Sequence, residues 1–427
     1  MNQYIVKKIT EKKNINVEVP GSKSITNRAL MLAAMSDGVC TLNGVLFSAD
    51  SRAFLNCLIK LGFEVEIDEK NRKVVIKGEN GTIPNKKATI NVQSAGTAAR
   101  FMTVFLAVAG GDYVLESSEQ MKKRPMKELL DSLIEKGVEI KYLENEGHFP
   151  FEIHSAGIGS VEMTIDTTTS SQYASALLMA SVMNGMKICL TGSRVNGAYI
   201  KITLKMMEQF GIKYDKSENT YFVERQVYNC PVYDIEPDMS AACYFYAMAL
   251  ILRTKSVVRG IHKDSMQGDI KFLWALEKLG CKVSETEKGI EVDASEVDAY
   301  DGIEIDMSDF SDQALTMAVV SAFAKSPTRI KNIGHIRGQE SDRVQVIVTE
   351  LNKLGCDASI IEENGITDVV IKPGKLHGAE IETYDDHRVA MSFAMAGLVV
   401  DGVVIKNPMC CRKTFENYFD VLDGIVD

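Results

Sequence analysis

The residues that could carry chemistry gather at the starts of predicted buried helices. Six such starts are rich in Ser, Thr, Gly, Asp and Arg, and read SKSITNR (22–28), SAGTAAR (94–100), TSSQ (169–172), PDMSAA (237–242), FSDQA (310–314) and DDHR (385–388). Helix capping explains the hydroxyls and carboxylates, but it does not require the cations of these segments, Lys23, Arg28, Arg100 and Arg388. Helix N-termini combined with Arg and Lys form anion sites. The pattern therefore predicts a cleft for a ligand with several negative charges.

A repeated architecture must position these helix starts. Six helices rich in Ala and Met are apolar nearly all round, which is typical of buried helices. They contain Ala29, Ala98, Ala174, Ala242, Ala314 and Ala390, at spacings of 69, 76, 68, 72 and 76 residues. Five amphipathic helices end at Gly62, Gly137, Gly211, Gly280 and Gly355, spaced 75, 74, 69 and 75 residues apart. Gly62 suits the left-handed conformation that ends a helix, and the alternating apolar residues after it predict a hairpin.

The ends of the chain suggest how the repeats divide into domains. The sixth amphipathic helix, NYFDVLDGIVD, reaches the C-terminus with no hairpin after it, so we expect residues 3–19 to supply strands that complete that repeat. The prediction is a domain of residues 1–19 plus 240–427, which holds both termini, with an inserted domain of residues 20–239 and the active site in the cleft between them. Pro20 and Pro237 lie near the two crossovers, where helices and strands tend to stop.

Composition excludes several classes of protein. The chain has 427 residues, of which 45% are hydrophobic and 25% charged, as in ordinary globular proteins. With 48 Lys and Arg against 58 Asp and Glu, its net charge of −10 disfavours a nucleic-acid binder. The longest apolar stretch, from Phe101 to Ala109, is too short for a membrane helix. The N-terminus, MNQYIVKKITEKKN, does not resemble a signal peptide.

The cysteines and histidines point to a cytoplasmic protein without a metal centre. Nine cysteines with no C-x-x-C pair fit reduced thiols, and we expect the adjacent Cys410 and Cys411 to be buried spectators. The six histidines are scattered and none is paired at ligand spacing. We expect no metal, no membrane association and a monomer.

Ten motifs, in order along nearly the full chain, resemble the 5-enolpyruvylshikimate-3-phosphate synthase (3-phosphoshikimate 1-carboxyvinyltransferase) family. They are PGSKSITNRA (20–29), AGTAAR (95–100), MKKRP (121–125), SSQ (170–172), YIKITL (199–204), DSMQGDI (264–270), SDQALT (311–316), ESDR (340–343), DDHRVAM (385–391) and KTF (413–415). The resemblance implies an α/β fold of two similar domains, each of three βαβαββ units, in an inside-out, barrel-like arrangement. That agrees with the six repeats counted above.

The resemblance also implies the reaction. The enolpyruvyl group of phosphoenolpyruvate moves to the 5-hydroxyl of shikimate 3-phosphate by addition and elimination, and phosphate leaves. The family uses no metal or organic cofactor. The reaction belongs to the shikimate pathway, which makes chorismate and the aromatic amino acids.

Both substrates carry a phosphate and a carboxylate, so fixed cations must hold them. By the resemblance, the residues that would hold phosphoenolpyruvate are Lys23, Arg124, Arg343, Arg388 and Lys413, with the Gly96 backbone close against it. Those that would hold shikimate 3-phosphate are Ser24, Arg28, Ser170, Ser171, Gln172 and Asn196, together with Asp312, His335 and Gln339. Gly96 also predicts sensitivity to glyphosate, the family's inhibitor at the phosphoenolpyruvate site.

Addition and elimination require acid and base groups near one carbon. Asp312 resembles the family carboxylate against the 5-hydroxyl, and we predict that it accepts the proton. Glu340 resembles the second family carboxylate, near the methylene end of phosphoenolpyruvate. The further candidates to move protons or stabilise charge are Lys23, His387 and Lys413.

The sequence departs from the family at several positions. Gln339 stands where the family has Lys, and Gln can neither carry a positive charge nor transfer a proton at neutral pH. Asn196 replaces a Ser, and His335 stands where Asn is frequent; both can still donate hydrogen bonds. Ser94 and Phe101, near Gly96, also differ from the usual Asn and Pro.

Two alternative functions stay open. The related enolpyruvyl transferase acting on UDP-N-acetylglucosamine carries a Cys five residues before the Arg of its loop, whereas here Glu119 lies five residues before Arg124. The other alternative is a catalytically impaired homologue that binds a phosphorylated ligand, which only Gln339 supports.

Overall fold

The computed structural model describes residues 2–426, which form two compact units. Unit 1 contains the residues up to Pro20 and those from Pro237 onward, and unit 2 is Gly21–Glu236. The chain enters and leaves unit 2 at neighbouring points. The Ser22 amide donates to the Glu236 carbonyl at 2.8 Å, and the Asp238 amide donates to the Pro20 carbonyl at 2.8 Å.

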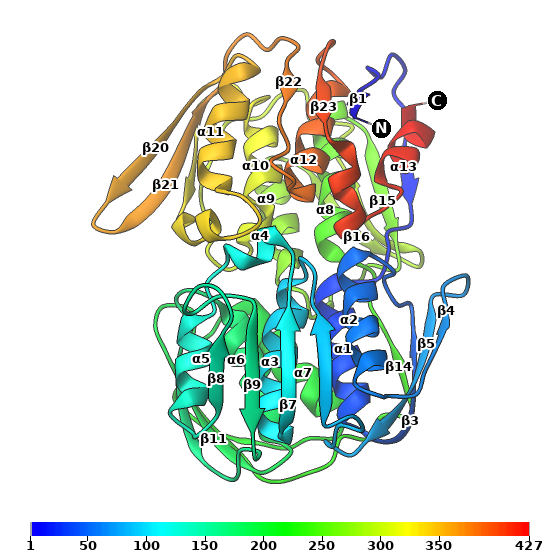
Figure 1. The fold of residues 1–427 in the computed structure, drawn as a ribbon. Helices are drawn as coiled ribbons and strands as arrows, with labels where there is room; N and C mark the ends of the chain where they lie inside the picture. Colours follow the sequence, from blue (N-terminus) through cyan, green and yellow to red (C-terminus); the bar gives the residue numbers. More distant parts are fainter. Residues whose placement is uncertain (1, 427) are drawn as a thin grey trace. The chain divides into compact units, whose positions relative to one another are not determined.

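Unit 2 contains three four-stranded sheets, ordered β14-β3-β5-β4, β6-β7-β9-β8 and β10-β11-β13-β12 (Figure 1). The strands are β3 (Asp37–Asn43), β4 (Val65–Asp68), β5 (Lys73–Glu79), β6 (Lys87–Asn91), β7 (Gly111–Glu116), β8 (Glu139–Tyr142), β9 (Phe151–Ser155), β10 (Glu162–Asp166), β11 (Met186–Thr191), β12 (Asp215–Ser217), β13 (Thr220–Val223) and β14 (Val232–Asp234). The helices are α1 (Lys23–Met35), α2 (Ala49–Lys60), α3 (Gly96–Ala109), α4 (Glu119–Lys122), α5 (Lys127–Ile134), α6 (Ser171–Ser181) and α7 (Ala198–Gln209).

Unit 1 repeats this plan with sheets ordered β16-β17-β15-β2, β18-β19-β21-β20 and the three-stranded β1-β23-β22. The strands are β1 (Gln3–Ile5), β2 (Ile15–Val17), β15 (Lys255–Arg259), β16 (Lys282–Thr286), β17 (Gly289–Asp293), β18 (Glu304–Asp306), β19 (Thr328–Lys331), β20 (Asp357–Glu363), β21 (Ile366–Lys372), β22 (Glu380–Ile381) and β23 (Val404–Lys406). The α-helices are α8 (Met239–Leu252), α9 (Lys271–Lys278), α10 (Ala314–Ser321), α11 (Arg343–Lys353), α12 (His387–Gly397) and α13 (Tyr418–Val426). The 3₁₀ helices are η1 (Gly268–Ile270), η2 (Ser311–Gln313), η3 (Gly334–Gly338) and η4 (Pro408–Lys413).

Each four-stranded sheet has one parallel and two antiparallel pairings. In the second sheet of unit 2, β6 runs parallel to β7, whereas β9 pairs antiparallel with both β7 and β8. The parallel pair brackets the buried helix, and the antiparallel pair is the hairpin that follows the amphipathic helix. This is the βαβαββ unit that the family resemblance implies.

The N-terminal segment completes two repeats rather than one. Strand β1 pairs antiparallel with β23, so the expectation that residues 3–19 complete the last repeat is right for β1. Strand β2 instead pairs parallel with β15 and supplies the first strand of another repeat of unit 1. In unit 2, β14 has the same role beside β3, although its three residues gave no signal in the sequence.

The Ala-rich helices form the core, as predicted. Ala29, Ala98 and Ala174 in unit 2 are fully buried on α1, α3 and α6, and their equivalents in unit 1 are fully buried on α8, α10 and α12. Helices α8, α10 and α12 pack against one another, which explains why α8 is apolar all round. No helix in residues 2–426 is long and apolar enough to cross a membrane.

The glycines after the amphipathic helices adopt left-handed backbone conformations, as predicted for Gly62. Its φ is 91°, and the φ values at Gly137, Gly211, Gly280 and Gly355 are 88°, 87°, 96° and 100°. A residue with a Cβ is strained in this conformation, which accounts for Gly at each of these positions.

Candidate active site

The predicted site residues of unit 1 lie at the starts of its helices, in three 3₁₀ helices and in the loop before α11. Asp312 is on η2 just before α10, and Arg343 begins α11. His387 and Arg388 begin α12, and Lys413 ends η4. Their side chains form one cluster, in which three cations alternate with carboxylates.

Arg343 is the centre of this cluster. It is almost fully buried, and its guanidinium donates to Asp386 at 2.8 Å, to Asp312 at 3.1 Å and to Glu340 at 3.0 Å. Burial alone would lower the pKa of Arg343, but the charges of Asp386, Glu340 and Asp312 together raise it above its usual value. Arg343 is therefore a permanent cation that holds two of the predicted catalytic carboxylates.

Both oxygens of Asp312 accept hydrogen bonds from arginines. Oδ1 accepts from Arg343 Nη1 at 3.1 Å, and Oδ2 accepts from Arg388 Nη2 at 2.9 Å. These two hydrogen bonds fix the plane of the carboxylate. Charge-assisted bonds of this kind are short and directional, so Asp312 is oriented before a substrate arrives.

Glu340 lies between Arg343 and a buried lysine. Its second oxygen is 3.4 Å from Lys413 Nζ. Gln339 accepts a hydrogen bond from Arg343 through its side-chain carbonyl. His335 Nε2 lies 2.7 Å from the Ser311 hydroxyl, and the buried His387 has Nδ1 3.8 Å from Asp386. All the predicted residues of unit 1 thus belong to one network or border it.

In unit 2, most of the predicted residues lie at the N-termini of α1, α3 and α6, whereas Arg124 follows α4 and Asn196 precedes α7. Ser22 and Ala95 occupy the cap positions of α1 and α3, and neither helix has a side-chain cap hydrogen bond. Ser170 does cap α6, accepting from the Gln172 amide at 3.2 Å. Capping therefore does not explain the composition of the first two starts, and their amides are suited to an anion.

Gly96 begins α3 and lies directly against Arg124. A Cβ added at Gly96 would be 2.7 Å from Arg124 Nη1, too close for any real contact. Arg100, one turn along α3, donates to the Gly96 carbonyl at 3.3 Å and to the Pro125 carbonyl at 3.0 Å. Arg100 thus braces the loop that carries Arg124.

Arg28 is buried beneath the helix starts. Its guanidinium donates to Thr203 at 2.7 Å, to the Ser24 carbonyl at 2.8 Å and to Ser175 at 3.1 Å. These bonds join α1 to α6 and α7. Burial lowers the pKa of Arg28 to about 10. The hydrogen bond from Arg28 to the Ser24 carbonyl helps to fix the backbone of Ser24.

The other predicted residues of unit 2 differ in exposure. Lys23 and Ser24 are half-buried in the first turn of α1, and Lys23 Nζ lies 3.6 Å from Asp50. Ser171 is buried, whereas Ser170 and Gln172 are half-buried. The Oε1 atom of Gln172 is buried without a hydrogen-bond partner, as expected of a group that awaits a ligand. Asn196 is exposed in the turn before α7.

Three acidic residues of these clusters were not predicted. Asp386 lay within the DDHR motif but was given no role, and it is the fully buried partner of Arg343. Asp50 faces Lys23, and Asp269 lies behind Asp312. A helix start such as SAD (48–50) gives only a weak signal in sequence, because capping alone explains it.

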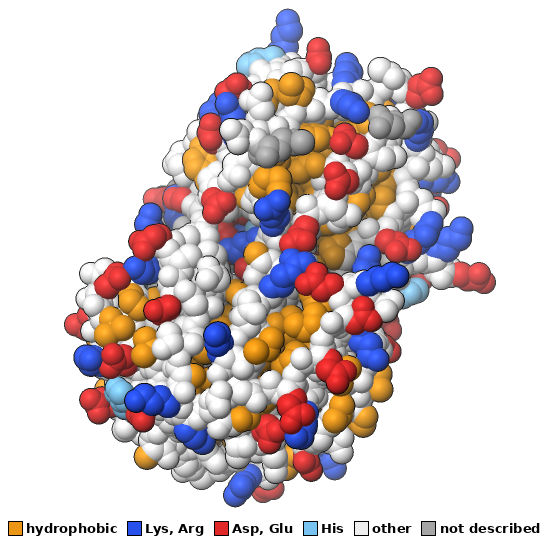
Figure 2. Space-filling model, turned by 45° about the vertical axis from the view of Figure 1, so that its right-hand side comes forward, with side chains coloured by type: hydrophobic (Ala, Val, Ile, Leu, Met, Phe, Trp, Pro, Cys, Tyr) orange, Lys and Arg blue, Asp and Glu red, His pale blue; other side chains and the backbone are white. Residues whose placement is uncertain are grey.

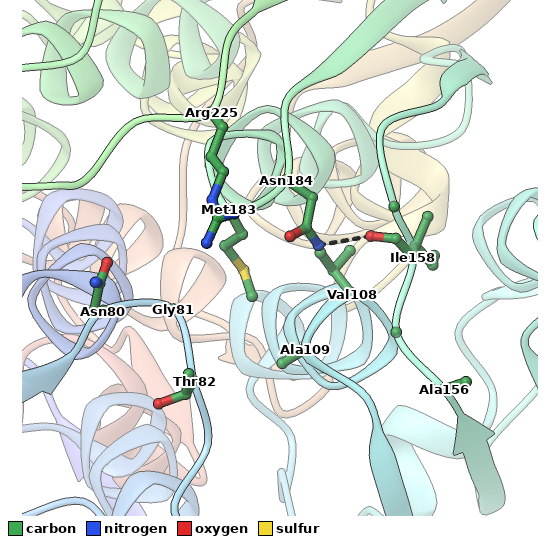
Figure 3. A pocket seen from close by; sticks show the side chains of 12 residues that line it. Asn80, Gly81, Thr82, Val108, Ala109, Ala156, Ile158, Met183, Asn184 and Arg225 are labelled. Atoms are coloured by element: carbon green, nitrogen blue, oxygen red, sulfur yellow. Dashed lines mark hydrogen bonds between the residues drawn. The ribbon is translucent and has the colours of Figure 1, made fainter.

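Unit 2 also contains a hollow of about 410 Å³ at the other end of its buried helices (Figure 3). It is lined by residues near the C-terminal ends of α3 and α6, such as Ala109 and Met183, and by the loops that follow β5, β9 and β13. Arg225 is its one charged lining residue. None of the predicted site residues lies there.

The surface of the protein carries charges of both signs. On the face shown in Figure 2, basic and acidic side chains are interspersed. Within residues 2–426, no group of His, Cys, Asp and Glu is arranged to hold a metal ion. Cys410 and Cys411 are buried, and the pKa of the Cys411 thiol is raised by burial and by Cys410. The charge of Asp386 also raises the pKa of Cys411, and a thiol that stays protonated is a poor nucleophile.

Comparison with known proteins identifies relatives along the whole chain. Residues 8–422 match the family model described as EPSP synthase (3-phosphoshikimate 1-carboxyvinyltransferase). Relatives named 3-phosphoshikimate 1-carboxyvinyltransferase include that of Nostoc punctiforme, 38% identical over 407 residues and 94% of each chain. That of Vibrio vulnificus is 39% identical over 423 residues and 97% of each chain. Among solved structures, the EPSP synthase of Acinetobacter baumannii matches with a TM-score of 0.81 at 22% identity, covering 100% of this chain and 98% of that chain, which confirms the predicted fold.

Proposed function

Because this chain belongs to the EPSP synthase family, we propose that it transfers the enolpyruvyl group of phosphoenolpyruvate to the 5-hydroxyl of shikimate 3-phosphate and releases phosphate. The observation that carries the proposal is that Arg343 and Arg388 both donate hydrogen bonds to Asp312, while Arg343 also donates to Glu340. This arrangement sets two oriented carboxylates among fixed cations. It meets the needs of a reaction that moves protons next to phosphate and carboxylate groups.

The cations bind the substrates' negative charges. Arg343, Arg388 and Lys413 in unit 1 are each bound to carboxylates of the protein. A guanidinium has five N–H donors, so Arg388 can bind a phosphate or carboxylate of the substrate while its Nη2 still orients Asp312. The substrate's negative charge then shares the cations with Asp312 and Glu340, which act as bases.

We assign the proton transfers to the carboxylates and to nearby lysines. Asp312 accepts the proton of the 5-hydroxyl as that oxygen attacks carbon 2 of phosphoenolpyruvate. The methylene carbon takes up a proton in the same addition, and we assign its donor to Lys413, which forms an ion pair with Glu340 at 3.4 Å. In the elimination, a base removes a proton from the new methyl group as phosphate leaves, and we assign this step to Glu340.

The unit 2 residues complete the set of substrate contacts. We assign Lys23 and Arg124 to phosphoenolpyruvate, together with the uncapped start of α3 at Gly96. Ser24, Ser170, Ser171, Gln172 and Asn196 are assigned to shikimate 3-phosphate, with Arg28 as the support of Ser24.

Gln339 does not prevent this chemistry. Its side-chain carbonyl accepts from Arg343, which leaves its amide group to donate to a hydroxyl or phosphate oxygen. A Lys at this position would instead bring a second positive charge next to Arg343. We propose that Lys413 is the lysine that pairs with Glu340. Gln339 and His335 contact shikimate 3-phosphate.

The alternative acceptor, UDP-N-acetylglucosamine, is not favoured. The family match is to EPSP synthase, and Glu119, at the position of the other enzyme's Cys, has an exposed side chain that pairs with Lys122 at 2.9 Å. The alternative of an impaired homologue rests on Gln339, and turnover decides it.

The test is phosphate release from purified protein with phosphoenolpyruvate and shikimate 3-phosphate. We expect turnover in the unaltered protein and a loss of about 100-fold or more in kcat for Asp312→Ala, a typical cost for a missing general base. The matched control is Asp309→Ala, because Asp309 lies three residues away and pairs with Lys271 on the surface; it should keep full activity. If calorimetry shows that the unaltered protein binds the substrates but no phosphate is released, and Gln339→Lys restores turnover, the protein is the impaired homologue.

A further inference from the structure

A buried serine and a buried aspartate lie behind the Asp312–Arg388 pair. Ser240 is in the first turn of α8 and Asp269 is in η1, and each is more than nine-tenths buried. The Ser240 hydroxyl donates to Asp269 Oδ2 at 2.5 Å and accepts from Arg388 Nη2 at 3.3 Å. The same Nη2 donates to Asp312 Oδ2 at 2.9 Å. A continuous chain of contacts thus runs from Asp269 through Ser240 and Arg388 to Asp312.

The groups around Asp269 make its charge sensitive to pH. It faces Asp238 and Cys243 from α8, Arg388 from α12 and Asp312 from η2. Burial and the charge of Asp312 raise the pKa of Asp269 to about 7, although Arg388 and the Ser240 hydrogen bond lower it. Asp269 therefore exchanges a proton near neutral pH, where an ordinary aspartate is fully ionised.

We propose that Ser240 and Asp269 are positioning residues, which hold the Arg388 guanidinium where it binds phosphoenolpyruvate and orients Asp312. This inference rests on the proposed function and assigns roles to two residues outside the predicted site. The chain of contacts carries it, because Arg388 touches Asp312 and Ser240 with the same nitrogen. A change at Ser240 therefore reaches the proton acceptor through a single intermediate side chain.

The charge of Asp269 decides how well Ser240 holds the arginine. An ionised carboxylate only accepts, so the Ser240 hydroxyl must donate to it, and the lone pairs of that oxygen face Arg388. A protonated Asp269 can itself donate to Ser240, which releases the hydroxyl from this orientation. The guanidinium is thus held more firmly when Asp269 is charged.

The test compares Ser240→Ala and Asp269→Asn with the unaltered protein. For Ser240→Ala we expect kcat/KM for phosphoenolpyruvate to fall about tenfold, with a higher KM for phosphoenolpyruvate and a change of less than about twofold in KM for shikimate 3-phosphate. Ser240→Thr keeps the hydroxyl and should restore most of the activity. Unchanged kinetics in Ser240→Ala would overturn the proposal. A lower kcat with both KM values unchanged would also overturn it, because that result reports only a smaller fraction of active protein.

Two variants control for the loss of a buried polar group. Ser321→Ala removes the buried hydroxyl that donates to Met317 on α10. Asp368→Asn alters a buried carboxylate of β21 that accepts from Arg329 and from the Asn332 amide. We expect both controls to lower stability while both KM values stay the same. If the controls raise KM for phosphoenolpyruvate as much as Ser240→Ala does, the proposal is wrong.

The double variant and the pH dependence test the route of the effect. If Ser240 acts through Asp269, kcat/KM of the Ser240→Ala/Asp269→Asn protein is no lower than that of the less active single variant. If the double variant instead shows the product of the two single losses in kcat/KM, the residues have independent roles and the proposal is overturned. The activity of Asp269→Asn relative to the unaltered protein should fall at least about threefold from pH 6 to pH 8. A ratio that is constant with pH contradicts the role given to its charge.

Binding of phosphoenolpyruvate by calorimetry separates this inference from the proposed function. If the unaltered protein releases no phosphate, the proposed function fails, and the positioning role is then judged on affinity alone. A dissociation constant about tenfold weaker in Ser240→Ala supports the role. Equal dissociation constants, or no binding to the unaltered protein, overturn it.

Discussion

At the scale of residues, the site combines cations and carboxylates that neutralise one another until a substrate arrives. Arg343 and Arg388 hold Asp312 from two sides, and Lys413 lies against Glu340. Buried charges of this kind are costly unless they are paired. The protein therefore keeps these three cations buried by pairing them with carboxylates.

Gly96 gives a sharp prediction because it lies directly against Arg124, a predicted phosphoenolpyruvate ligand. Gly96→Ala would place a Cβ 2.7 Å from Arg124 Nη1, so the guanidinium would have to shift from its present position. We expect KM for phosphoenolpyruvate to rise about tenfold or more, and glyphosate to inhibit less in competition with it. Steady-state kinetics with glyphosate titrations measure both.

The control for this substitution is Gly159→Ala, where a Cβ meets nothing within 4 Å. It should leave KM and inhibition unchanged. Unaltered glyphosate inhibition in Gly96→Ala would show that the inhibitor does not bind against this helix start.

Asp269 predicts how stability depends on pH. Its pKa in the folded protein is about 7, above the ordinary value of 3.8, so the folded state holds a proton that the unfolded chain releases. Its contribution to stability is full below pH 4 and is lost as the pH rises through 7. Urea unfolding should show that the free energy of unfolding falls more from pH 5 to pH 8 in the unaltered protein than in Asp269→Asn. Equal losses in the two proteins would contradict the raised pKa.

The sequence could single out candidate site residues but not their contacts. Lys23, Asp312, Glu340, Arg343 and Lys413 stood out through their motifs, because each type suits phosphate or proton chemistry. Which carboxylate faces which arginine depends on helices that are distant in the chain. Arg28, for example, reads as a ligand contact in sequence but donates to side chains and carbonyls of the protein.

At the scale of elements, periodicity identified the helices more reliably than the strands. A buried helix of eleven residues or more, such as α6 or α8, gives a clear apolar pattern. Strands β2 and β14 have three residues each, too few for an alternating pattern to show. Their parallel pairings with β15 and β3 therefore had to come from the structure.

The glycines that end the amphipathic helices provide a test of the repeat. Gly137→Ala puts a Cβ in open space, so it should cost only the left-handed strain of about 1–2 kcal/mol in the free energy of unfolding. Gly62→Ala should cost more, because its Cβ would lie 2.9 Å from the Asn85 side chain, which donates to the Lys60 carbonyl at the end of α2. Urea unfolding at one pH compares the two. Equal costs would show that Asn85 moves away freely.

At the scale of the whole molecule, the N-terminal strand closes unit 1. Besides its pairing with β23, Tyr4 donates to Asp423 at 2.6 Å and its ring lies 4.4 Å from that of Phe419. The side chain of Val6 packs so closely against Gly397 that a Cβ there would be 2.4 Å away. The first residues of the chain thus help to hold α12, whose first turn carries His387 and Arg388.

Removal of residues 1–6 should therefore weaken one unit selectively. We expect faster hydrogen exchange in β23 and α12, with a lower kcat, and unchanged exchange in β6, β7 and β9 of unit 2. The unit 2 strands serve as the internal control within the same sample. Uniformly faster exchange would mean that the strand stabilises the protein as a whole.

The pairing of β1 with β23 also orders events during synthesis. Tyr4 and Asp423 are separated by 419 residues, and at roughly 5–20 residues per second the ribosome needs about 20–80 s to cover that length. Unit 2 has all its strands once β14 has been synthesised, whereas β1 has no partner strand until β23 emerges. A nascent chain therefore carries all the strands of unit 2 while unit 1 is still incomplete, and a chaperone that shields exposed strand edges would act on β1 during that interval.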